Sequence, residues 1–71
     1  MAFSREIPSD DEVVAMLNQL GGHADALKLC RALMEAGHPK LQSQLAIQRA
    51  AERRRLVVNA DWTLSLPALA A

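Results

Sequence analysis

Apolar and polar residues follow one another along this chain in short groups, whose spacing is first typical of helices and then of strands. After Ser9, apolar residues recur three and four positions apart, which predicts an amphipathic helix whose inner stripe contains Val13, Leu17 and Leu20. Ser9 and Glu12 form a capping box at the start of this helix, and Gly21-Gly22 ends it.

A second helix is predicted from about Ala24 to Ala36, because charged residues such as Lys28 and Arg31 occupy one side of it. Gly37 ends this helix and the following Pro39 prevents its continuation. Its apolar side contains Ala26, Leu27, Cys30, Leu33 and Met34. Cys30 is therefore expected to be buried, and as the only cysteine it can form no disulfide within the chain, which fits a reducing compartment.

A third helix, from about Lys40 to Arg54, carries one narrow polar stripe composed of Gln42, Ala46, Arg49 and Arg53. Arginine can pair with guanine and glutamine with adenine, while a small alanine allows close approach, so this stripe suits a DNA groove. The alternative is a solvated helix face whose cations favour the carboxyl end of the helix dipole. Leu41 and Leu45 lie on a different side, so the helix is either wedged between two elements or in contact with a second protein.

Two strands joined by a short turn are predicted after this helix. Leu56-Val57-Val58 is followed by the turn Asn59-Ala60-Asp61, and strict alternation then places on one face Trp62, Leu64 and Leu66. Trp62 is predicted to cover the end of the core, with stacking on a nucleic-acid base as the alternative.

Length and composition indicate one small globular domain. The chain has 71 residues, of which 51% are hydrophobic, too many for a disordered chain, and no long apolar run could cross a membrane. The first twelve residues include an acidic cluster where a secretory signal would need a basic region, so a cytoplasmic protein is expected.

The zero net charge divides unevenly between the two halves of the chain. Residues 1–36 carry three basic and six acidic side chains, and residues 37–71 carry five basic and two acidic ones. The basic half favours a surface that faces phosphate groups. There is no glycine-rich phosphate loop, no nucleophile beside a base and no group of metal ligands, since His23 and His38 are far apart. The sequence therefore predicts no enzyme, no metal and no cofactor.

The order helix, helix, polar helix and hairpin, with the ending ERRRLVVNADWTLSL, resembles a winged helix-turn-helix domain from Ser9 to Leu66. The resemblance implies an α+β fold of three helices with a C-terminal two-stranded β-hairpin as the wing. The domain would span residues 9–66, between a flexible arm of residues 1–8 and a flexible tail of residues 67–71. Arg54 or Arg55 stands where the family commonly has a glycine, and the wing tip lacks lysine and arginine.

This resemblance implies a duplex DNA-binding protein, such as a small transcriptional regulator, with the third helix in the major groove. Carried over, it assigns base contacts to Gln42, Ser43, Gln44, Ala46 and Arg49. It assigns contacts to the DNA backbone to Lys40, Arg53, Arg54 and Arg55. Because one copy covers only a half-site, a homodimer or a partner beside it is expected. The alternative is a winged-helix module for protein–protein interaction, for example a small phage or mobile-element protein that docks on a host protein.

Overall fold

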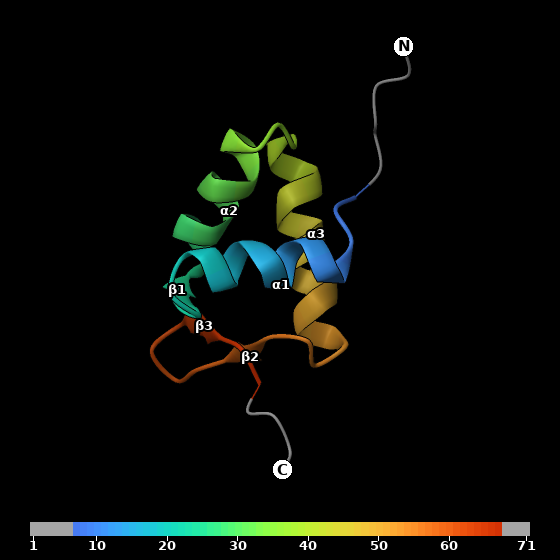
Figure 1. The fold of residues 1–71 in the computed structure, drawn as a ribbon. Coiled ribbons are helices and arrows are strands. Elements are labelled where there is room, and N and C mark those ends of the chain that lie inside the picture. Colours follow the sequence, from blue (N-terminus) through green and yellow to red (C-terminus); the bar gives the residue numbers. More distant parts are fainter. Residues whose placement is uncertain (1–6, 68–71) are drawn as a thin grey trace.

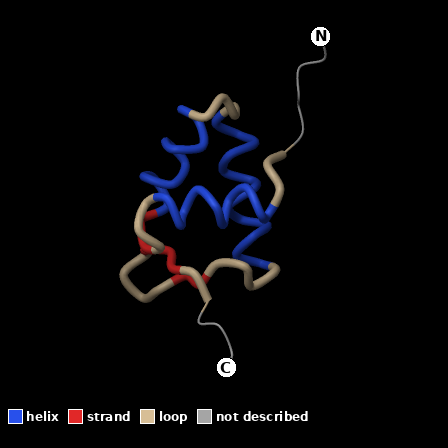
Figure 2. Tube along the Cα trace, viewed as in Figure 1, coloured by secondary structure: helices blue, strands red, loops and turns tan. Residues whose placement is uncertain are grey.

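The computed structural model describes residues 7–67, which form three helices and a three-stranded antiparallel sheet (Figure 1). In chain order the elements are α1 (Asp10–Gln19), β1 (His23–Asp25), α2 (Ala26–Glu35), α3 (Lys40–Glu52), β2 (Val57–Val58) and β3 (Thr63–Ser65). α1 crosses in front of α2 and α3, and the small sheet lies where α2 begins and α3 ends (Figures 1 and 2). This is the predicted α+β fold, consistent with a winged helix whose wing is the β2–β3 hairpin.

Two residues of the predicted N-terminal arm, Ile7 and Pro8, lie within the described residues. Most of the predicted arm and tail lies outside the described residues. Within them, Pro8 is buried and Ile7 packs against the core.

α1 starts and ends as its sequence predicts. The Ser9 hydroxyl accepts a hydrogen bond from the Glu12 amide at 3.2 Å, which satisfies one of the amides that a helix start leaves unpaired. After the helix, Gly21 and Gly22 have φ angles of +98° and +81°, which glycine adopts without steric cost. The Gly22 amide donates to the carbonyl of Leu17 at 2.9 Å and closes the helix end.

The predicted start of the second helix is wrong by two residues, because His23–Asp25 forms strand β1. Ala24 pairs with Leu64 of β3, a partner 40 positions away in the sequence, and is buried. α2 then starts at Ala26, and the Asp25 carboxylate accepts a hydrogen bond from the Lys28 amide at 2.7 Å. Asp25 is therefore the last residue of a strand and the N-cap of a helix at once.

α2 buries a different face from the predicted one. Leu29, Cys30 and Leu33 are buried, as predicted for Cys30 and Leu33. By contrast, Leu27 is 62% exposed and Met34 is 42% exposed. The inner face is thus rotated toward Leu29, and part of the apolar side of α2 lies at the surface.

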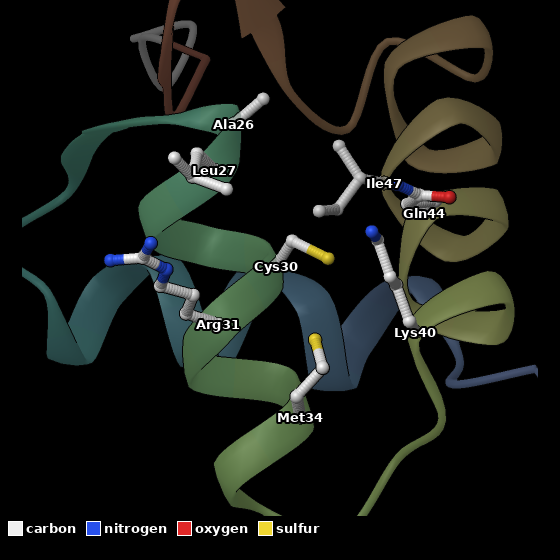
Figure 3. A pocket seen from close by; sticks show the side chains of 8 residues that line it. All are labelled: Ala26, Leu27, Cys30, Arg31, Met34, Lys40, Gln44 and Ile47. Atoms are coloured by element: carbon white, nitrogen blue, oxygen red, sulfur yellow. The ribbon is translucent and has the colours of Figure 1, made fainter.

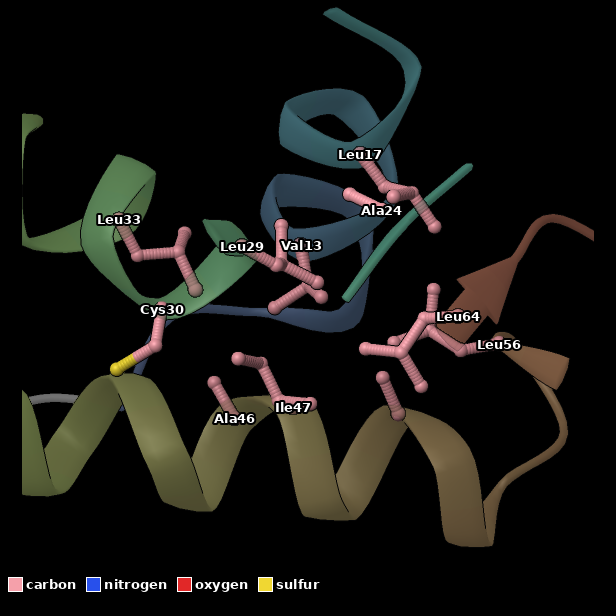
Figure 4. Close-up of a cluster of buried hydrophobic side chains, with 11 residues drawn as sticks. Val13, Leu17, Ala24, Leu29, Cys30, Leu33, Ala46, Ile47, Leu56 and Leu64 are labelled. Carbon is pink, nitrogen blue, oxygen red and sulfur yellow. The ribbon is translucent and has the colours of Figure 1, made fainter. Parts of the chain in front are cut away.

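A single core joins the three helices to the sheet (Figure 4). Each helix contributes at least two buried apolar residues, and the sheet contributes one from each of two strands. The core consists of Val13, Leu17, Ala24, Leu29, Cys30, Leu33, Ala46, Ile47, Ala50, Leu56 and Leu64. This core is small, as expected for a chain of this length, which buries a smaller fraction of its surface than a larger domain does.

β3 is the middle strand of the sheet, because the strand order is β1-β3-β2. Val57 pairs with Ser65 and Val58 pairs with Leu64, which confirms the predicted hairpin. Its turn is held by the Asn59 amide group, which donates to the Ser65 hydroxyl at 2.7 Å.

The prediction that Trp62 covers the end of the core is wrong. Trp62 belongs to the turn of the hairpin, has a φ angle of +66° and is 80% exposed. The alternation of inward and outward side chains begins only after it, with Leu64 buried and Thr63 and Ser65 half-buried. The turn therefore extends one residue further than the sequence pattern indicates.

The exit from α3 uses an arginine in a conformation that favours glycine. Arg54 has a φ angle of +62°, as expected from its place where the winged-helix family commonly has a glycine. The next amide, of Arg55, donates to the carbonyl of Ala50 at 2.8 Å, and Leu56 then enters the core. This left-handed residue turns the chain from the end of α3 toward β2, at the cost of some backbone strain.

Candidate functional site

α3 has a buried face that includes two of the five predicted base contacts. Ser43 is fully buried and Ala46 is 1% exposed. The Ser43 hydroxyl donates to the carbonyl of Pro39 at 2.9 Å, so its hydrogen-bonding capacity is used within the protein. Both residues pack toward α1 and α2 and cannot reach a base, so these two assignments are corrected.

The remaining predicted base contacts differ in exposure. Gln44 and Arg49 are exposed, whereas Gln42 is half-buried. The outer face of α3, opposite the buried residues, is centred between Gln44 and Arg49 and contains Leu41, Gln44, Gln48, Arg49 and Glu52, while Lys40 lies beside this face on the side of α2. Gln48 was missed by the sequence analysis, although it lies two turns after Lys40 and one turn after Gln44 on the same side.

Two of the three consecutive arginines are bound to the acidic start of α1. The Arg53 guanidinium donates to both carboxylate oxygens of Asp10, at 3.1 and 3.2 Å. Arg55 donates to Asp11 at 2.6 Å, and this hydrogen bond with the charge of Asp11 raises the pKa of Arg55 above its usual range. Arg54 is exposed and forms no ion pair within residues 7–67.

These ion pairs join part of the acidic first half of the chain to part of the basic second half. The acidic residues of the first half and the basic residues of the second half meet where α1 begins and α3 ends. A third contact also joins the two halves of the chain: His38 Nε2 lies 3.7 Å from a carboxylate oxygen of Glu12. Much of the basic charge assigned to DNA phosphates is therefore used to hold two helices together.

Other cations remain on the surface formed by α2 and α3. Lys28, Arg31, Lys40 and Arg49 are exposed, and none forms an ion pair within the described part of the chain. Lys28 and Arg31 come from α2, and the other two come from α3.

Two open apolar grooves adjoin each other along one flank of α3, one between α2 and α3 and the other between α3 and the wing. The first, the α2–α3 groove, has a volume of about 390 Å³ and is lined by Ala26, Leu27, Cys30, Arg31, Met34, Lys40, Gln44 and Ile47 (Figure 3). The second, the α3–wing groove, has a volume of about 450 Å³ and is lined by Ala26, Gln44, Ile47, Gln48, Ala51, Glu52, Val58, Trp62 and Leu64. Both include Ala26, Gln44 and Ile47, so they are parts of one surface.

Within residues 7–67, no three or more histidine, cysteine, aspartate or glutamate side chains are grouped so that they could hold a metal ion. Cys30 is only 6% exposed, at the floor of the α2–α3 groove. The helices of this part of the chain are too short and too polar to cross a membrane.

Comparison of the chain with models of known protein families, with curated proteins and with solved structures finds no match.

Proposed function

We propose that this protein binds duplex DNA, with the outer face of α3 in the major groove. The observation that carries the proposal is that no other described element covers this face, which presents Gln44, Gln48 and Arg49 to solvent, with the exposed Lys40 beside it. An α-helix fits the major groove of B-DNA, and these side chains can hydrogen-bond with base edges and phosphates.

The proposed contacts differ from those expected from sequence. Gln44 and Gln48 are about 6 Å apart along the helix, so their amides can reach adenines of nearby base pairs. Arg49 stays as a contact to a base, and Lys40 stays as a contact to phosphate. Arg53 and Arg55 are weaker candidates for phosphate contacts, because their charges are already paired with the carboxylates of α1.

Lys28 and Arg31 of α2 extend the cationic surface beside α3. Together with Lys40, they give three phosphate contacts, and binding should weaken with a log–log salt slope of about −2.7. One α3 helix reads only a short half-site, so a regulator of transcription of this kind would act as a dimer or beside another protein. Such a protein would work in the cytoplasm, where bacterial or phage DNA lies.

The test is fluorescence anisotropy of a labelled random duplex at several salt concentrations. The double variant Lys40→Ala/Arg31→Ala should lower the slope by about 1.8, since each lost phosphate contact removes about 0.9. Arg53→Ala is the matched control, because that arginine is bound to Asp10 and its loss should leave the slope nearly unchanged. Absence of binding at low salt would refute the proposal.

A further inference from the structure

The surface formed by the two grooves exposes an unusual number of large apolar side chains for so small a domain. Leu27 and Met34 line the α2–α3 groove, and Val58 and Trp62 line the α3–wing groove. Their exposed fractions are 62%, 42%, 50% and 80%. Contiguous exposed apolar side chains, rimmed by polar ones, are typical of a surface that binds a protein.

Positive charge borders the apolar floor of the α2–α3 groove. Arg31 comes from α2 and Lys40 from α3, and neither forms an ion pair within the described residues. The Lys40 side chain extends between the two helices, near Cys30 and Met34 (Figure 3). A partner that buries apolar side chains here would gain from carboxylates placed beside them.

We propose that this surface docks an acidic amphipathic helix of a partner protein. The apolar side chains of that helix lie in the two grooves, and its carboxylates pair with Arg31 and Lys40. This is the helix-in-groove mode of recognition, in which residues one or two turns apart act as anchors. The proposal goes beyond DNA binding and identifies a second kind of ligand for the same side of the molecule.

The charges of the chain argue against a second copy of this protein as the partner. Its acidic segment, Asp10 and Asp11 at the start of α1, is already bound to Arg53 and Arg55. DNA alone is also a poor match, since protein–DNA interfaces are polar and would leave Leu27 and Met34 without apolar contacts. Because Lys40 and Gln44 belong to both proposed surfaces, the partner helix and DNA should compete.

The experiment uses synthetic helical peptides of about four turns. The first has leucines one and two turns apart and glutamates beside them; the second has lysines in place of the glutamates. The third has alanines in place of the leucines. Trp62, the only tryptophan, lies in the α3–wing groove and reports binding by its fluorescence. We expect the glutamate peptide to shift its emission to shorter wavelength and to bind at least tenfold more tightly than the other two.

Substitutions at the surface give the decisive comparison. Leu27→Ala should weaken binding of the glutamate peptide at least fivefold, whereas Leu41→Ala, at an equally exposed leucine outside both grooves, should have no effect. The double variant Arg31→Glu/Lys40→Glu should reverse the preference and favour the lysine peptide. These residues are exposed, so circular dichroism should show an intact fold in every variant.

Three outcomes would overturn the proposal. The first is equal affinity for the glutamate and lysine peptides, and the second is unchanged affinity after Leu27→Ala. The third is failure of the glutamate peptide to bind while Leu27→Ala weakens binding to the random duplex, which would assign the surface to DNA. DNA binding is measured separately by anisotropy, so either proposal can fail without the other.

Discussion

The contact between Arg53 and Asp10 joins the end of α3 to the start of α1, and its contribution to stability can be isolated in a double-mutant cycle. One guanidinium nitrogen contacts both carboxylate oxygens, and the Asp10 side chain is only 14% exposed, against 61% for Arg53. Exposed ion pairs contribute about 0.2–1 kcal/mol, and the partial burial of Asp10 favours the upper part of that range, about 0.7 kcal/mol. In a domain of this size, this free energy corresponds to about 3–6 °C in Tm.

The assay is urea unfolding of the wild type, Asp10→Ala, Arg53→Ala and the double variant, at low and at high salt. The cycle cancels the interaction of Asp10 with the dipole of its own helix and leaves the coupling between the two side chains. The coupling should fall at about 1 M salt, where screening is strong. The cycle for Arg55 and Asp11 should give a smaller coupling, because Asp11 is 85% exposed. A coupling below about 0.2 kcal/mol, or one that salt does not reduce, would refute this reasoning.

Three further predictions concern stability and pH. Arg54→Gly should raise the free energy of unfolding by about 0.5–1 kcal/mol, because glycine adopts the φ angle of +62° without strain; a loss of stability in urea unfolding would contradict this. Leu17→Ala should cost about 3 kcal/mol, because Leu17 is fully buried, whereas Trp62→Ala should change urea unfolding by less than about 0.5 kcal/mol. Hydrogen bonds from the Thr63 hydroxyl and amide lower the pKa of Asp61. The Asp61 carboxylate therefore stabilises the fold at pH values above its ordinary pKa, and this stabilisation is lost as the pH falls through the lower pKa of the folded state. Asp61→Asn should therefore reduce the free energy of unfolding near neutral pH, and should reduce it less at about pH 2.5. If the difference between wild type and variant is the same at both pH values, the stabilising role of the Asp61 carboxylate is disproved.

Features that depend on neighbouring residues could be predicted from the sequence. The Ser9 cap, the left-handed glycines after α1 and the hairpin all follow from signals within a few positions. β1 could not be predicted, since three residues without their own periodicity become a strand only by pairing with residues 63–65. The ion pair between Arg53 and Asp10 has the same origin, a contact across 43 positions.

The candidate site was predicted only in part, because α3 carries apolar residues around most of its circumference. On a helical wheel, Leu41 and Leu45 lie on one side and Ile47 lies on another, so the sequence left the orientation of the helix open. Packing against α1 and α2 selected the face of Ala46 and Ile47 and left Leu41 at the surface. With a buried alanine and an exposed leucine on one helix, the hydrophobicity of single residues does not indicate which face turns inward.

The central position of β3 has a consequence for synthesis of the protein on the ribosome. Both β1 and β2 have β3 as their partner, yet β3 is the last of the three strands to be made. A nascent chain that ends before Thr63 can form its helices, but both other strands remain unpaired and the core lacks Leu64. Premature termination near residue 62 should thus leave an incomplete domain for proteases to remove, so that the cell accumulates only chains whose sheet has closed.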